Sequence, residues 1–215
     1  MRKLVISFLL LFTFTLAYSQ YTLIKPELYI GTNQGVNLWP NVSFTPTVAQ
    51  NFDVRYKGGF TVRYVNLKYF GFQAELNYSQ QGWSETSATG EVYSHRFDYL
   101  ELPILAHIYF GKKNTKFFVN LGPEIRYMVA DVATAPFSAG AGIQQTKPIE
   151  NRFDYGITGG LGVEYRTKKA GAFQIEARYH FGLGNVFNSS KKDEFSTSNN
   201  QAISVSLVYL FNVLK

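Results

Sequence analysis

Apolar and polar residues alternate along most of the chain, a pattern that predicts β-strands. In the clearest segment, residues 203–213, large apolar residues take the odd positions, and Ser204, Ser206 and Asn212 take even ones. The same alternation marks seven other segments, at residues 27–36, 52–64, 72–78, 100–108, 117–127, 155–165 and 173–183. The first of these alternates least cleanly, and no segment after the N-terminal stretch has a helical period. The pattern therefore predicts an all-β protein of eight strands.

The predicted connections alternate between long and short along the chain. Short ones fall near residues 67–69, 111–116 and 167–171, and longer polar ones near 37–51, 83–92, 134–151 and 187–199. Barrels of the bacterial outer membrane have short periplasmic turns, long external loops and an even strand count. Many segments also exceed the mean soluble strand of about 5–6 residues. We therefore expect an eight-stranded antiparallel up-and-down transmembrane β-barrel.

In each segment the polar residues occupy every second position, which we call the polar parity. The charged residues at these positions indicate that the polar parity lines the lumen. If residues 110 and 117 flank a turn, Glu101 faces Arg126. In the hairpin flanked by 166 and 172, long side chains face small residues, which suits a narrow lumen that side chains fill; the facing pairs are Glu176 with Gly162, Arg178 with Gly160 and His180 with Thr158. In the 66/70 hairpin Arg63 lies diagonal to Glu75. We expect a lumenal polar network of Arg63, Glu75, Glu101, Glu124, Arg126, Glu164, Glu176, Arg178 and His180.

Two prolines interrupt predicted strands. Pro103 and Pro123 lie mid-strand, where neither donates a ladder hydrogen bond, and Pro103 faces Glu124 in the same register. A bulge or kink shared by the two strands would explain both prolines.

The N-terminus has the features of a secretory signal peptide. Arg2 and Lys3 precede an apolar run at residues 4–16, and Ala17-Tyr18-Ser19 places small residues at −3 and −1. An uncleaved anchor helix is the alternative, but the run is short and a polar segment follows it. We expect cleavage before Gln20, which gives a signal peptide at 1–19 and a barrel domain at 20–215.

The composition excludes several classes of protein. Of the 215 residues 46% are hydrophobic and 17% charged, which excludes a bundle of membrane helices but not a membrane barrel, since barrel strands average to neutral hydropathy. The 17% aromatic content suits rings at the lipid headgroup level. With no cysteine there is no disulfide, thiol nucleophile or lipoprotein anchor. Cleavage lowers the formal charge from +6 to +4, too small a surplus to indicate nucleic-acid binding.

Six stretches resemble the outer-membrane β-barrel family common in Bacteroidota, often labelled porin-family or PorT-like. They are residues 31–37, FGFQAELNYSQQGW at 70–83, YLELPILAHIYF at 99–110, NLGPEIRYM at 120–128, FDYGITGGLGVEY at 153–165 and EARYHFGLGNVFN at 176–188. The resemblance implies an eight-stranded barrel in the cell outer membrane of a Gram-negative cell, with a link to protein secretion in some relatives. The sequence departs from many outer-membrane proteins at its end, where Phe211 is followed by Asn212-Val213-Leu214-Lys215.

Catalytic and metal sites find little support. Ser94 and His95 are sequence neighbours, which point to opposite faces of a strand, and His95 is expected at a loop edge. His180 and Glu176 share a face, so His180 could be a catalytic base that Glu176 orients. A hydrogen-bonded histidine in the barrel interior is the more common explanation. Three dispersed histidines give no metal site. The glycines at 156–162 precede no helix, so a phosphate loop is not expected.

Three functions remain open: a side-chain-filled structural or interaction barrel, a small-solute channel, and a lipid-modifying barrel enzyme. We expect the first, no enzyme activity and no cofactor. The expected partners are outer-membrane lipid, the barrel-assembly machinery and a membrane or secretion-system protein, with no nucleic acid.

Overall fold

The computed structural model describes residues 23–45, 50–86, 90, 92–133, 149, 151–167, 170–187 and 197–214. The expected signal peptide and its cleavage site lie outside these residues. The strands are β1 (Leu23–Asn37), β2 (Asn41–Thr45), β3 (Arg55–Leu67), β4 (Phe70–Thr86), β5 (Val92–Phe110), β6 (Thr115–Ala133), β7 (Phe153–Arg166), β8 (Ala172–Asn185) and β9 (Thr197–Asn212). No helix in these ranges is long and apolar enough to cross a membrane.

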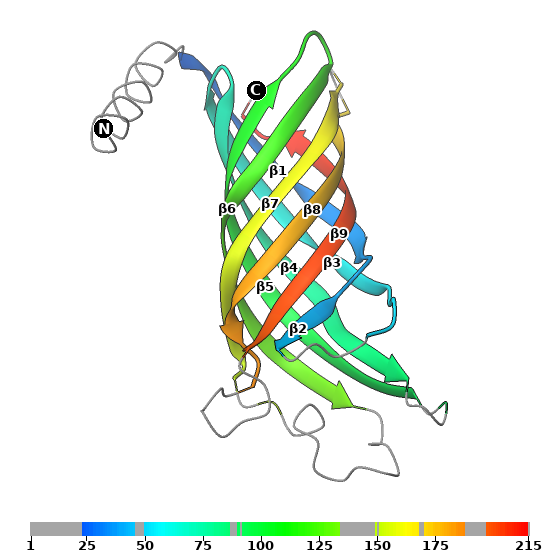
Figure 1. Cartoon of the computed structure of the whole chain (residues 1–215). Helices are drawn as coiled ribbons and strands as arrows, with labels where there is room; N and C mark the ends of the chain where they lie inside the picture. The colour runs from blue at the N-terminus through cyan, green and yellow to red at the C-terminus, as the bar shows by residue number, and fades with distance from the viewer. Residues whose placement is uncertain are drawn as a thin grey trace, which may run out of the picture.

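The strands form a closed antiparallel ring of eight (Figure 1). Each strand from β3 to β9 pairs with the next, β1 pairs with β3, and β1 also pairs with β9 to close the ring. The short β2 pairs with β9 just beyond the end of β1, so it prolongs the same position in the wall. The predicted eight-stranded up-and-down barrel is confirmed.

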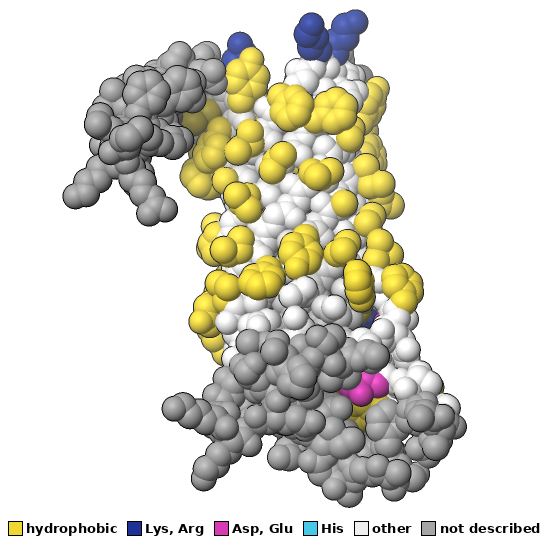
Figure 2. Space-filling model, in the orientation of Figure 1, with side chains coloured by type: hydrophobic (Ala, Val, Ile, Leu, Met, Phe, Trp, Pro, Cys, Tyr) yellow, Lys and Arg dark blue, Asp and Glu magenta, His cyan; other side chains and the backbone are white. Residues whose placement is uncertain are grey.

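The predicted faces are confirmed as well. Large apolar side chains at the outward parity are exposed over the whole wall, as Leu161, Leu207 and Phe60 illustrate with exposed fractions of 66, 65 and 66%. Figure 2 shows hydrophobic side chains spread over the face of the barrel that it presents. The alternate residues are buried inside the ring. A water-soluble barrel would have the opposite arrangement.

Strand ends differ from the predictions at the end of the barrel opposite the short turns. The expected loop at 37–51 contains β2, β4 continues through Trp83 to Thr86, and β9 begins at Thr197. β5 and β6 each have 19 residues, whereas about 9–11 cross a membrane. These strands therefore extend beyond the hydrocarbon layer.

The predicted bulge at the prolines is wrong. Pro103 pairs with Glu124 and Ala106 with Leu121, so the same register holds on both sides of the prolines. The register of this hairpin shifts instead between Asp98 and Tyr99. A proline removes one ladder donor, and here that loss leaves the strand spacing intact.

Candidate functional site

The lumen brings together the charged residues that the alternation assigns to the inner parity. All nine residues of the expected network are buried, with exposed fractions of 7% or less; they are Arg63, Glu75, Glu101, Glu124, Arg126, Glu164, Glu176, Arg178 and His180. Buried charges are costly unless they are paired and hydrogen-bonded. The partners of these nine residues therefore decide whether the buried charges of the lumen are neutralised.

Near the short turns, Arg63 on β3 reaches β7 on the opposite side of the ring. Its Nη1 donates to Glu164 Oε2 at 2.6 Å, and its Nε donates to Gln73 at 2.7 Å. Arg166 also binds Glu164, and its Nη1 lies 3.3 Å from Glu27 Oε2. One buried carboxylate thus holds two arginines at this end.

In the middle of the lumen, Arg178 on β8 spans to β4. Its Nη1 and Nη2 lie 2.8 and 2.7 Å from the two carboxylate oxygens of Glu75, a bidentate pair. The same guanidinium binds Glu176 Oε2 at 2.9 Å. Asn77 also donates to Glu75 Oε2, and Asn120 donates to Glu176 Oε1.

Toward the far end, Glu101 on β5 forms ion pairs with two cations. Lys57 Nζ lies 2.7 Å and Arg126 Nη2 3.2 Å from its oxygens. Arg126 Nε also donates to Glu124 Oε1 at 2.5 Å, and His180 Nδ1 lies 3.3 Å from that oxygen. The three ion-pair groups therefore follow one another along the barrel.

The predicted hairpin registers are confirmed. Glu101 faces Arg126, and Arg178 faces Gly160, as the turn positions require. Arg63 faces Gln73 and so lies diagonal to Glu75, but its ion pair is with Glu164, across the lumen. Sequence reasoning left several buried partners out of the expected network, although each shares the inner parity of its strand; these are Asn33, Lys57, Gln73, Asn77, Gln81, Asn120, Asp154 and Gln174.

Side chains already occupy the space beside the lumenal glycines. A Cβ placed on Gly160 would lie 2.4 Å from Glu176 Oε1, and one on Gly162 would lie 2.5 Å from Phe118 Cζ. A Cβ on Gly156 would lie 2.8 Å from His180 Cε1. The space opposite each long residue is already filled by that residue or its neighbour.

Apolar side chains occupy both ends of the lumen. At the turn end Val65, Tyr109 and Phe118 pack together and are at most 5% exposed. At the far end lies a larger cluster that sequence reasoning did not foresee, comprising Val42, Trp83, Tyr93, Phe97, Tyr99, Met128, Val186 and Phe187. The polar network is thus enclosed between two apolar layers.

His95 belongs to this far cluster. It lies within β5 and is 2% exposed, so the expected loop-edge position is wrong. Its Nε2 binds Asp131, the Tyr93 hydroxyl lies 3.2 Å from Nδ1, and Trp83 packs on the ring at 5.1 Å between centroids. Among the described residues, no group of His, Asp and Glu side chains is arranged to hold a metal ion.

Comparison with known proteins identifies the family. The profile described as "Outer membrane protein beta-barrel domain" matches residues 18–188. The chain belongs to this family. It is therefore a protein of the cell outer membrane, and its exposed apolar wall faces lipid. No curated protein matches the chain.

Solved outer-membrane barrels are similar to this chain at low sequence identity, and the first of them shares its fold. OprG from Pseudomonas aeruginosa has a TM-score of 0.54 and 10% identity over 90% of this chain and 97% of that one. Ail of Yersinia pestis, solved in complex with the heparin analogue sucrose octasulfate, has 0.41 and 12% over 86% and 97%. Neisserial surface protein A has 0.44 and 10% over 87% and 98%.

Membership in the outer-membrane barrel family also orients the molecule. Short turns of such barrels face the periplasm, so the β3–β4 and β5–β6 turns mark the periplasmic end. The far aromatic cluster then lies at the extracellular end of the lumen.

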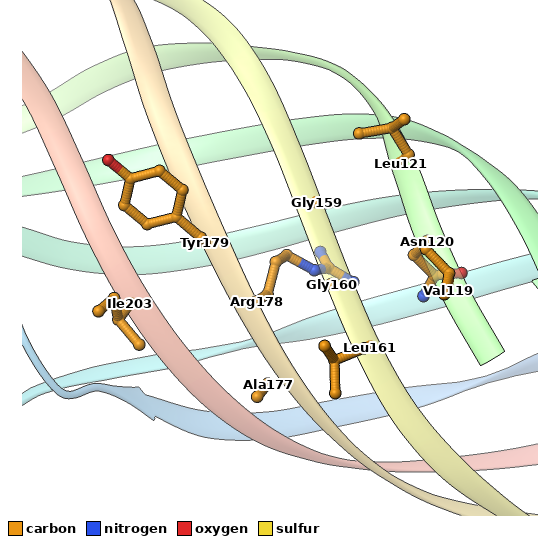
Figure 3. Close-up of a pocket in the computed structure, with 10 residues that line it drawn as sticks. All are labelled: Val119, Asn120, Leu121, Gly159, Gly160, Leu161, Ala177, Arg178, Tyr179 and Ile203. Carbon is orange, nitrogen blue, oxygen red and sulfur yellow. The ribbon is translucent and has the colours of Figure 1, made fainter. Parts of the chain in front are cut away.

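A groove of about 500 Å³ lies on the wall formed by β6, β7, β8 and β9. Gly159 forms its floor on β7, flanked by Leu121 on β6 and by Tyr179 and Ile203 on β8 and β9 (Figure 3). A Cβ on Gly159 would lie 3.4 Å from Leu121 Cδ1 and 3.9 Å from the carbonyl oxygen of Asn120, both ordinary contacts. The lining also includes Asn120 and Arg178, so the groove borders the polar network.

Proposed function

We propose that the protein is a closed outer-membrane barrel with a structural or interaction role, and that its lumen conducts no solutes. The observation that carries the proposal is the set of contacts between opposite walls. Arg63 with Glu164, Arg178 with Glu75, and Asn200 with the Tyr99 hydroxyl each join strands four places apart in the ring of eight. Side chains that bridge the full width of the lumen leave no continuous water path.

The apolar layers support the same proposal. A charged, open lumen would favour water and ions, but ions entering here would first have to displace buried aromatic side chains. Tyr99 and Phe97 are at most 1% exposed at one end, and Phe118 is 2% exposed at the other. Eight strands also make a cylinder whose interior side chains can fill.

The interaction role concerns the parts of the barrel that project from the membrane. β5 and β6 exceed the span of the hydrocarbon layer by several residues and carry their side chains into the extracellular region. We propose a membrane or secretion-system protein as partner, and the barrel-assembly machinery during insertion. The motifs at 99–110 and 153–165 support a place in the Bacteroidota porin-family branch, in which some relatives act in secretion.

A lipid-modifying enzyme is not proposed. Nucleophilic catalysis by a hydroxyl needs a base hydrogen-bonded to it. In the described part of the chain, His107 bonds Asn120 and His180 contacts Glu124, and no histidine is hydrogen-bonded to a serine.

Planar-bilayer recordings of the purified protein test the proposal. We expect at most small, flickering currents, with detergent alone as the control for leaks. A steady, large conductance would overturn the closed-barrel proposal and establish the small-solute channel in its place.

A further inference from the structure

The periplasmic turns carry a group of lysines. Lys68 lies in the β3–β4 turn, Lys112 and Lys113 lie in the β5–β6 turn, and Lys116 is the second residue of β6. We call these four residues the lysine arc. Lys68, Lys112 and Lys113 are exposed, and Figure 2 shows basic side chains beyond the hydrophobic ones at this end.

The β3–β4 turn is hydrogen-bonded to the end of β5 just before the β5–β6 turn, so the arc lies on neighbouring hairpins. The backbone N–H of Tyr109 donates to the carbonyl of Tyr69 at 3.0 Å, and the Tyr109 hydroxyl donates to the carbonyl of Leu67 at 3.1 Å. β4 and β5 are also neighbours in the ring. The amines of the arc therefore project from one side of the periplasmic rim.

Within the described residues, no carboxylate neutralises the arc. Glu27 and Glu164, the acidic residues at this end, both bind Arg166. Lys116 Nζ donates to the carbonyl of Gly111 at 3.2 Å, and Lys68 Nζ lies 5.2 Å from the Tyr69 ring centroid. The arc thus presents a net positive surface without internal counter-ions.

The neighbouring aromatic residues fix the depth of the arc. Tyr69, Phe110 and Phe117 are 44, 54 and 50% exposed, and the two phenylalanines stack at 5.9 Å. Exposed aromatic rings at the edge of a barrel wall mark the headgroup level. Each lysine lies within one to three residues of one of these rings, which places its amine where lipid phosphates lie.

Lys113 holds its position at a backbone cost. Its φ is +53°, in the left-handed region, where glycine or asparagine is favoured. Among the described non-glycine residues it is the one with positive φ. A local strain of this kind is consistent with a side chain retained for its charge.

We propose that the lysine arc docks anionic phospholipid headgroups of the periplasmic leaflet. The arc continues the lipid-facing wall, and its charge complements lipid phosphate. An acidic protein would need a surface that reaches down to the aromatic rings, so lipid is the better fit.

Native mass spectrometry of the detergent-solubilised barrel, given equal phosphatidylglycerol and phosphatidylcholine, tests the proposal. We expect phosphatidylglycerol-bound protein to exceed the phosphatidylcholine-bound form about fivefold or more, since each lysine near an anionic surface contributes about that factor. Lys113→Gly should lower the preference about fivefold while relieving the φ strain, so it should not unfold the barrel. Combined Lys68→Gln, Lys112→Gln and Lys113→Gly changes should abolish the preference.

Two controls separate charge at this surface from charge in general. Lys112→Arg with Lys68→Arg should keep the preference, and Arg96→Gln, which removes an exposed cation at the opposite end, should leave it unchanged. Equal binding of the two lipids by the unmodified protein overturns the proposal. So does selective capture of soluble polyglutamate without a lipid preference, which would assign the arc to an acidic protein.

Discussion

Arg178 on β8 and Glu75 on β4 form a bidentate pair across the centre of the lumen, with nitrogen–oxygen distances of 2.7 and 2.8 Å. Their strands stand on opposite sides of the ring. Arg178 also holds Glu176 of its own strand, so one guanidinium neutralises two carboxylates. This bridge divides the lumen into two halves.

Removing the bridge should open the barrel. In the Glu75→Ser, Arg178→Ser double variant the crossing side chains are too short to meet, and water can enter beside Glu176. We expect single-channel currents several-fold larger than those of the unmodified barrel in planar bilayers. Gly159→Ser, at the same level on the lipid face, is the matched control and should leave the currents unchanged. Currents that stay the same in the double variant would show that the apolar end layers alone close the lumen.

Hairpin pairs were predictable from the sequence because two facts determine them. Alternation fixes the face of each residue, and the turn position fixes the register, so Glu101 was placed opposite Arg126 by arithmetic alone. Contacts between opposite walls follow a different rule. Whether Arg63 meets Glu75 or Glu164 depends on the tilt and closure of the ring, which no single hairpin contains.

The extracellular end was harder to predict because apolar residues there face the interior of the barrel and not lipid. Inside the membrane, apolar residues face lipid. Beyond the membrane, Trp83 and Phe97 turn inward and pack together, since the outer surface there meets water. A rule that assigns every apolar residue to the lipid face therefore places Trp83 in a loop.

The Glu101–Arg126 pair predicts a measurable coupling. Both side chains are fully buried, so Glu101→Gln should leave Arg126 and Lys57 short of a counter-ion, at a cost of about 3–5 kcal/mol in the free energy of unfolding. Arg126→Gln should cost less in its effect on Glu101, because Lys57 remains 2.7 Å away. A double-mutant cycle by urea unfolding in detergent should give a coupling of about 0.5–3 kcal/mol. Additive effects would mean that the two residues do not interact.

The mature protein should begin at Gln20. The basic residues Arg2 and Lys3, the apolar run and the Ala17-Tyr18-Ser19 site together specify cleavage there. N-terminal sequencing of protein extracted from outer membranes checks this. An intact Met1 on the membrane-extracted protein would indicate an uncleaved anchor.

Two glycines of β7 should respond in opposite ways to alanine. Gly159 faces lipid, and a Cβ there would lie 3.4 Å from Leu121 Cδ1 and 3.9 Å from the carbonyl oxygen of Asn120, both ordinary contacts. Gly159→Ala should therefore raise the free energy of unfolding by about 0.4–1 kcal/mol, because it reduces the freedom of the unfolded chain. A Cβ on Gly162 would lie 2.3 Å from the carbonyl oxygen of Ile175 and 2.5 Å from Phe118 Cζ, so Gly162→Ala should cost about 1–3 kcal/mol. Urea titrations of both variants in lipid vesicles compare them directly. If Gly162→Ala were as stable as Gly159→Ala, the inner wall would have spare room beside Phe118, and the closed lumen would lose one of its supports.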